Sequence, residues 1–228
     1  MTVSPPRGRR GRPRAAAVDA PRDLDTESRI LDAARRVFVR RGTAGARMLE
    51  IAAEAGVNQA LLHYYFGTKE QLSERVFVES AGRLAAALIS VPPADATLDQ
   101  LVERFVVGYI DAVRTMPLIP PYLLAEAHQH PERIDALMVR AAGTVPAAIV
   151  AATAARVEQM IAERVAEGTM RPVSVRQFMV NVMALVSFPF LARPVLLGAF
   201  GFDDASFDEF LQQRRQELPR FIMNAMRP

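Results

Sequence analysis

Residues 47–72 read RMLEIAAEAGVNQALLHYYFGTKEQL, and this stretch determines the fold that we expect. Ile51, Ala52 and Ala55 recur at helical spacing and form one apolar side of a short helix. Gly56 then supplies the backbone freedom for a sharp turn, after which apolar residues again recur at helical spacing. Two short helices that meet at a glycine predict a helix-turn-helix.

The second of these helices carries polar or flat side chains at its outward positions. These positions are Asn58, Gln59, Leu61, Tyr64 and Tyr65. Such groups can contact base edges, thymine methyl groups and phosphates in a major groove. A plain helical hairpin inside an all-helical protein is the alternative, because spacing alone fits both interpretations.

A wider set of residues resembles the amino-terminal domain of TetR/AcrR-type bacterial repressors. The set comprises Ile30, Leu31, Ala33, Ala34, Val37, Phe38, Gly42, Ile51, Ala52, Ala55, Gly56, Val57, Phe66, Lys69 and Leu72. The matching region, residues 30–72, covers about a fifth of the chain. The resemblance implies an all-α protein, with an N-terminal three-helix DNA-binding domain and a C-terminal helical domain for ligand binding and dimerisation.

The resemblance also implies a set of DNA-contacting residues. They are Arg47, Asn58, Gln59, Ala60, Leu61, His63, Tyr64, Tyr65 and Lys69. Residues 58–61 fall where the recognition helix of the family enters the major groove. Lys69 starts the next helix, where its charge and the backbone N–H groups can together hold a phosphate.

Two positions depart from the family pattern. His63 stands where the family usually has a tyrosine that contacts phosphate. The alternative for His63 is an imidazole packed on the core of its own domain. Arg47 replaces a common capping threonine, so a cap is lost and a charge that can reach phosphate or guanine is gained.

The amino terminus is strongly basic. Five arginines precede the first acid, Asp19, so this segment accounts for the net charge of +3 and the remainder carries about −2. The segment RGRPR at residues 10–14 resembles an AT-hook, which predicts that Arg10, Arg12 and Arg14 enter an A·T-rich minor groove. A disordered basic arm with diffuse phosphate attraction is the alternative.

Composition is compatible with a small domain followed by a larger one. The chain has 228 residues, of which 50% are hydrophobic, and no cysteine, which excludes disulfides and thiol chemistry. We expect a basic arm at residues 1–22, the DNA-binding domain at 23–69 and the effector-binding and dimerisation domain at 70–228. Without a signal-like or membrane-spanning segment, we expect a soluble cytoplasmic protein that joins the nucleoid when bound to DNA.

Helical periodicity continues along the whole chain, and no strand pattern is visible. A first helix is expected at residues 26–41, with Arg35, Arg36 and Arg40 on a solvated face. Another begins after the cap signal at Gly67 and Thr68 and runs to about residue 90. Further helices are expected at 98–116, 121–129, 134–167, 175–192 and 207–226, separated by proline or glycine.

Methionine and aromatic residues in the larger domain are candidates for a ligand cavity. They are Phe105, Tyr109, Met116, Tyr122, Met160, Met179 and Met183. Their adaptable apolar side chains fit an apolar or amphipathic small molecule. Ordinary core packing explains the same residues at helical spacing.

The last two predicted helices carry more apolar surface than a short domain needs to cover. We expect a dimer interface formed by Phe178, Val182, Leu185, Phe190, Phe210, Leu211 and Phe221. In the resembling proteins these helices pair with their copies as a four-helix bundle. Such a homodimer reads a palindromic operator.

An enzyme is the competing class, but the motifs for it are weak. His128, His130 and Glu132 form an HxHxE string beside Pro131, without a further evident metal ligand. No phosphate loop, GxSxG elbow or HExxH pair is present, isolated acids fit solvated helix faces, and no cofactor is expected. The sequence therefore predicts a ligand-responsive repressor. A DNA-binding architectural protein without an effector and a helical enzyme are the alternatives.

Overall fold

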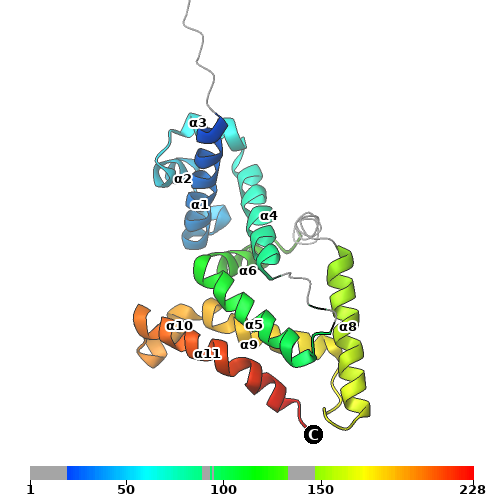
Figure 1. Cartoon of the computed structure of the whole chain (residues 1–228). Helices are drawn as coiled ribbons and strands as arrows, with labels where there is room; N and C mark the ends of the chain where they lie inside the picture. Colours follow the sequence, from blue (N-terminus) through cyan, green and yellow to red (C-terminus); the bar gives the residue numbers. More distant parts are fainter. Residues whose placement is uncertain (1–19, 89–92, 94, 133–146) are drawn as a thin grey trace, which may run out of the picture.

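The structure, a computed structural model, describes residues 20–88, 93, 95–132 and 147–228 (Figure 1). Within these residues the chain forms ten helices and no strand. Figure 1 shows α1, α2 and α3 together at one end, and α4 leads from them toward the larger domain. There α5, α9 and α11 pack against one another, and α8 stands at the edge. The all-α fold predicted from the sequence is confirmed.

The amino-terminal domain contains α1 (Ala20–Gly45), α2 (Met48–Ala55) and α3 (Gln59–Phe66). Helix α1 is longer at both ends than the predicted 26–41. Gly42 interrupts its regular geometry with φ of 68° and ψ of 160°. A Cβ atom on Gly42 would lie 2.7 Å from Oε1 of Gln129, so a glycine permits both this backbone geometry and the approach of that side chain.

A first hydrophobic core, which we call the DNA-domain core after the role predicted for these helices, joins them to α4 (Lys69–Leu88) and α6 (Ile119–Gln129). Its buried members are Ile30, Leu31, Ala34, Val37, Phe38, Ala46, Ile51, Ala52, Leu62, Phe66, Leu72, Val76, Phe77 and Tyr122. Three of them belong to α4 and one to α6. The DNA-domain core therefore extends past residue 69, where the sequence placed the end of the domain.

The larger domain contains five more helices. They are α5 (Leu98–Thr115), α8 (Ala147–Ala166), α9 (Val175–Leu191), α10 (Arg193–Phe200) and α11 (Asp204–Ala225). Five helices were predicted after residue 97. Four of them match α5, α6, α9 and α11 within three residues at each end. These are the helices predicted at 98–116, 121–129, 175–192 and 207–226. The predicted helix at 134–167 matches where it is described, but residues 134–146 lie outside the described part.

Helix α10 was not predicted, because Pro194 was interpreted as a break. Pro194 lies in the first turn of α10, where the missing N–H leaves no helical bond unmade. Capping explains where the neighbouring helices begin. The Asp203 side chain accepts from the Ser206 N–H at 2.8 Å and starts α11 three residues earlier than expected.

A second hydrophobic core, which we call the effector-domain core after the role predicted for this domain, lies among α5, α8, α9 and α11. Its buried members are Leu98, Val102, Val106, Tyr109, Ile110, Val113, Val157, Ile161, Met170, Phe178, Val182, Val186, Phe190, Phe207, Leu211, Leu218, Ile222 and Met226. Two bidentate pairs hold α11 on α5 at the surface: Arg114 donates to Asp208 at 2.8 Å, and Arg215 donates to Asp111 at 3.0 Å.

Among the described helices, none alone is long and apolar enough to cross a membrane. Helices α9 and α10 meet the length and composition requirement only as a pair, and they are bent by 70° at the break between them.

Candidate nucleic-acid interface and effector cavity

The turn between α2 and α3 is formed by Gly56 in the left-handed conformation, with φ of 66° and ψ of 34°. Its N–H donates to the carbonyl of Ala53 at 3.1 Å, and that of Val57 donates to Ala52 at 3.0 Å, so the end of α2 is closed. Leu62 and Phe66 then bury one side of α3 in the DNA-domain core. The opposite side of α3 faces solvent.

The outward side of α3 carries the residues predicted to read DNA. They differ in solvent exposure and in whether their side chains already make a hydrogen bond. Gln59, Ala60 and Tyr64 are exposed, and Tyr64 keeps 81% of its surface accessible. Leu61 and Tyr65 are half-buried. Asn58 caps the helix, because its side-chain oxygen accepts from the Leu61 N–H at 2.7 Å.

His63 makes one contact within α3 and one with the residue that caps it. Its Nδ1 lies 2.7 Å from the carbonyl oxygen of Gly67, and its Nε2 lies 3.3 Å from Nε2 of Gln59. The residue is exposed, so the interpretation of His63 as an imidazole packed in the core is wrong.

Arg47 and Lys69 flank the helix-turn-helix. Arg47 is exposed at the N-cap of α2 and makes no side-chain capping bond. Lys69 instead donates from Nζ to the carbonyls of Ala44 at 3.0 Å and Ala46 at 3.4 Å, at the end of α1. Its ammonium group therefore stabilises the C-terminal end of α1. The sequence did not suggest this role.

The predicted cap before α4 has a reciprocal form. The Thr68 hydroxyl accepts from the Gln71 N–H at 3.2 Å, and the Gln71 side chain accepts from the Thr68 N–H at 2.9 Å. Arg10, Arg12 and Arg14, the predicted minor-groove arm, lie outside the described residues.

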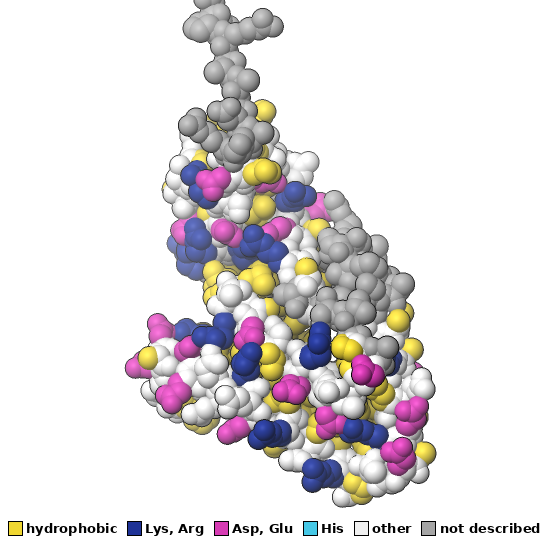
Figure 2. All heavy atoms as spheres, in the orientation of Figure 1, with side chains coloured by type: hydrophobic (Ala, Val, Ile, Leu, Met, Phe, Trp, Pro, Cys, Tyr) yellow, Lys and Arg dark blue, Asp and Glu magenta, His cyan; other side chains and the backbone are white. Residues whose placement is uncertain are grey.

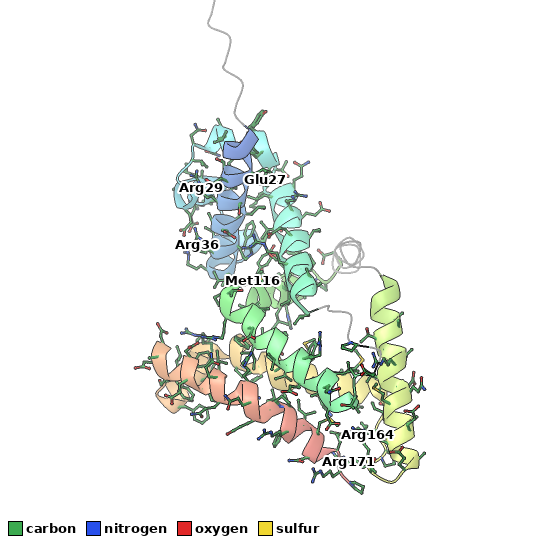
Figure 3. All side chains as sticks on the ribbon, viewed as in Figure 1. Glu27, Arg29, Arg36, Met116, Arg164 and Arg171 are labelled. Carbon is green, nitrogen blue, oxygen red and sulfur yellow. The ribbon has the colours of Figure 1, made fainter. Side chains whose placement is uncertain are left out.

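Two of the three arginines predicted on the solvated face of α1 tie α1 to α2. Arg36 and Arg40 each donate to the carboxylate of Glu54 at 2.8 Å. The hydrogen bond from Arg36, followed by that from Arg40, lowers the pKa of Glu54 below its ordinary value. Figure 3 shows Arg36 on the side of α1 that faces α2, and in Figure 2 basic and acidic side chains interleave over this face.

Arg35 is the third of these arginines, and its predicted place on a solvated face is wrong. Only 5% of its surface is accessible. Its guanidinium donates to Ser80 at 2.8 Å, to Asp32 at 2.6 Å and to Glu79. The bonds to Ser80 and Glu79 hold α4 against α1, whereas the bond to Asp32 lies within α1.

A second buried polar group joins α6 to the amino-terminal domain. Glu126 has 2% of its surface accessible and accepts from the hydroxyls of Thr43 on α1 and Ser73 on α4, the latter at 3.3 Å. One turn earlier, Tyr122 donates to the Ser73 carbonyl at 3.2 Å and stacks on Phe38 with ring centroids 6.1 Å apart. The expectation that isolated acids lie on solvated faces is wrong for Glu126. Its spacing of four residues from Tyr122 placed both on one helix face.

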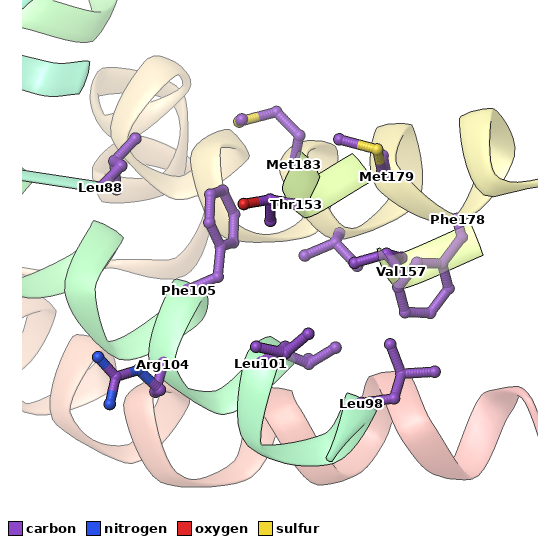
Figure 4. Close-up of a pocket in the computed structure, with 12 residues that line it drawn as sticks. Leu88, Leu98, Leu101, Arg104, Phe105, Thr153, Val157, Phe178, Met179 and Met183 are labelled. Atoms are coloured by element: carbon purple, nitrogen blue, oxygen red, sulfur yellow. The ribbon is translucent and has the colours of Figure 1, made fainter. Parts of the chain in front are cut away.

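A cavity of about 200 Å3 lies between α5, α8 and α9 (Figure 4). Its walls are formed by Leu88, Leu98, Leu101, Val102, Arg104, Phe105, Thr153, Val157, Phe178, Met179, Val182 and Met183. Among the described residues of this lining, only Arg104 and Thr153 carry polar side chains. In Figure 4, Phe105 from α5 and Met179 and Met183 from α9 reach the cavity from different helices.

Three of the seven predicted pocket residues line this cavity: Phe105, Met179 and Met183. The other four lie elsewhere. Tyr109 packs on Phe190 in the effector-domain core, with ring centroids 5.9 Å apart, and Met160 packs on the same core. Met116 caps the end of α5, where Figure 3 shows it, and Tyr122 belongs to the DNA-domain core.

The HxHxE string does not converge on one point. His130 Nδ1 lies 3.6 Å from Glu132, whereas His128 Nδ1 lies 2.8 Å from the Leu124 carbonyl in its own helix. Across the described part of the chain, no group of three or more histidine and acidic side chains is placed to hold a metal ion.

Comparison with known proteins agrees with this geometry. The model for bacterial regulatory proteins of the tetR family matches residues 30–76. The HTH-type transcriptional regulator BetI of Rhizobium meliloti is 33% identical over 141 residues, which cover 61% of this chain and 70% of that protein. This chain belongs to the TetR family.

Other relatives and structures agree with this assignment. An HTH-type transcriptional repressor of Streptomyces coelicolor is 39% identical over 79 residues, which cover 35% of this chain and 40% of that protein. A solved TetR family regulator from Marinobacter aquaeolei shares the fold, with a TM-score of 0.61 at 17% identity over 91% of this chain and 98% of that one. The TetR family consists of DNA-binding transcriptional regulators that are not enzymes.

In this TetR-family chain, the residues predicted at a dimer interface separate into two groups. Phe178, Val182, Phe190 and Leu211 are buried in the effector-domain core of their own chain and are not available to a partner. Leu185, Phe210 and Phe221 remain accessible and line a groove between α9 and α11. The sequence did not distinguish the inner from the outer face of these helices, because both faces are apolar.

Proposed function

We propose that this TetR-family regulator is a homodimeric repressor that binds a palindromic operator through α3 and is released by a small apolar or amphipathic effector. One observation carries the proposal: α4 connects the core of the DNA-binding domain to the cavity. Its beginning contributes Leu72, Val76 and Phe77 to the DNA-domain core, and its last residue, Leu88, lines the cavity. A twenty-residue helix spans about 30 Å, so displacement at the cavity moves the DNA-binding domain.

The exposed side of α3 supports the DNA-binding part of the proposal. Gln59 and Tyr64 present polar groups to solvent, whereas Arg47 adds a positive charge at the start of α2. In this arrangement Tyr64 and Arg47 contact backbone phosphate, and the amides of Asn58 and Gln59 contact bases. Ala60, Leu61, Tyr65 and Lys69 complete the proposed contacts, and His63 lies within the same interface beside Gln59.

The outer faces of α9 and α11 support a dimer. Val180 and Phe188, two turns apart on α9, are 62% and 57% accessible, and Phe221 on α11 is 60% accessible. Large apolar side chains that are this exposed indicate a surface that packs against another protein chain. A second copy that packs α9 and α11 against their equivalents covers Leu185, Phe210 and Phe221 and places two recognition helices on one operator.

The cavity lining supports the class of effector. The described wall residues are apolar except for Arg104 and Thr153, so a molecule with an apolar body and one polar group fits best. The effector releases DNA by favouring a spacing of the two recognition helices that does not match the operator. The Streptomyces coelicolor relative is named a repressor, which favours repression as the outcome.

Selection of bound sequences from a random duplex pool tests the proposal. The full chain is expected to recover an inverted repeat, and a chain lacking residues 1–14 is expected to recover the same repeat with weaker A·T preference in its flanks. Small apolar compounds are expected to raise the melting temperature and lower operator affinity together. Binding to any A·T-rich duplex without a preferred inverted repeat would contradict the proposal.

A further inference from the structure

Gln59, His63 and Gly67 form one column along α3, because residues four apart lie on the same helix face. His63 is at the centre of the column. Its Nδ1 lies 2.7 Å from the carbonyl oxygen of Gly67, and its Nε2 lies 3.3 Å from Nε2 of Gln59. The same Gly67 closes the helix, since its N–H donates to the His63 carbonyl at 2.9 Å.

These contacts determine which nitrogen of the imidazole carries the proton. A carbonyl oxygen can only accept, so Nδ1 of His63 donates to Gly67. In a neutral imidazole the other nitrogen is then an acceptor. Nε2 of His63 therefore accepts from the amide of Gln59.

This acceptor fixes the orientation of the Gln59 amide. One N–H of Gln59 is directed at His63, which leaves the carbonyl Oε1 and the second N–H for another partner. A glutamine recognises adenine with this combination of one acceptor and one donor. The neighbouring amide is less available, because the oxygen of Asn58 already caps α3.

We propose that His63 is a positioning residue that orients the amide of Gln59 for reading a base, in place of a phosphate contact of its own. The proposal rests on the proposed function, because it requires α3 to lie in a major groove. An amide held in one orientation before binding loses less rotational freedom when DNA binds. His63 thereby increases base discrimination at the position that Gln59 reads, without touching DNA itself.

The test uses the full chain and the duplex selected by the wild-type protein. Each base pair of that duplex is replaced singly, and affinities are measured for the wild type, Gln59→Ala, His63→Phe and the double variant. Phenylalanine keeps a ring and removes both nitrogens. We expect His63→Phe to reduce discrimination roughly 2- to 10-fold, as loss of one preordered side chain predicts. The reduction is confined to the base pairs that Gln59→Ala affects and is absent in the Gln59→Ala background.

A second variant and a comparison variant separate the possible roles of His63. His63→Tyr restores the residue of the resembling proteins and is expected to lose the same discrimination even where overall affinity rises. Tyr64→Phe removes a hydroxyl on the exposed side and is expected to weaken all duplexes alike. Unchanged melting temperatures show that the exposed substitutions leave the fold intact.

Two results would overturn the role of His63 alone. One is an equal loss of affinity for every duplex that persists in the Gln59→Ala background, because His63 then contacts phosphate directly. The other is an unchanged affinity panel for His63→Phe. If the wild type selects no preferred duplex, the proposed function fails as well, and this outcome is visible before any variant is measured.

Discussion

The DNA-domain core and the effector-domain core are built from similar apolar residues but are filled differently. The DNA-domain core is closed by Tyr122 from α6 and by the buried polar groups of Arg35 and Glu126. The effector-domain core instead leaves a cavity of about 200 Å3 between α5, α8 and α9. A closed core moves as one body, whereas a partly empty one can repack around a ligand. If the proposed function holds, deformation is expected at the cavity end of α4 and rigid displacement at its DNA-binding end.

The largest expected effect comes from opening the closed core. Tyr122→Ala removes a buried ring that stacks on Phe38 and a hydrogen bond to Ser73. We expect the free energy of unfolding to fall by about 3–5 kcal/mol, as for other buried aromatic residues replaced by alanine. Denaturant titration at a fixed protein concentration measures this change. Tyr122→Phe retains the ring and is expected to cost about 1 kcal/mol. A cost for Tyr122→Ala as small as that of Tyr122→Phe would show that α6 is not part of the closed core.

Tyr109 provides a test specific to the effector-domain core. Burial raises its pKa to about 12 from the ordinary 10.0. Because the folded pKa is the higher one, the stabilisation is complete below pH 10 and is lost as the pH rises from 10 toward 12. The loss approaches about 2–3 kcal/mol at the upper limit. Unfolding measured across this window is expected to be steeper with pH for the wild type than for Tyr109→Phe. Parallel curves for the two proteins would exclude Tyr109 as the source.

A matched pair of substitutions compares the packing of the two cores directly. Val37 in the DNA-domain core is fully buried, and Val157 lines the cavity. Val37→Leu adds a methylene to a fully buried side chain and is expected to cost about 1–3 kcal/mol. Val157→Leu places the same methylene toward the cavity, so its unfolding free energy is expected to change by less than about 0.5 kcal/mol. Equal costs at the two positions would remove the distinction between a closed and a partly empty core.

The sequence predicted the helices and the side of α3 that faces solvent, because both depend on local periodicity and turn chemistry. It did not predict contacts that join distant segments. Glu126 meets Thr43 across 83 residues, and Tyr122 meets Ser73 across 49. Phe178 and Val182 were expected on the dimer surface, but they line the cavity, because an apolar stripe does not state which of two apolar faces turns inward. In a sequence, a proline in the first turn of a helix looks the same as a proline that ends one. For this reason α10 was not predicted.

The smallest expected effect lies on the surface of the DNA-binding domain, at Glu54. Hydrogen bonds from Arg36 and then Arg40 lower the pKa of this exposed carboxylate from 4.5. Because the folded pKa is the lower one, the pair stabilises the fold above pH 4.5, and the stabilisation is lost as the pH falls through the folded value. Melting temperatures of the wild type and Glu54→Gln are expected to differ slightly at neutral pH and to converge in acid. Added salt is expected to reduce the difference, because the three side chains are at the surface.

A difference that persists in acid would mean that Glu54 acts through packing and not through its charge. Loss of stability in acid could then not be assigned to the DNA-binding domain through Glu54. Loss of stability in alkali would still be assigned to the larger domain, because Tyr109 titrates only there.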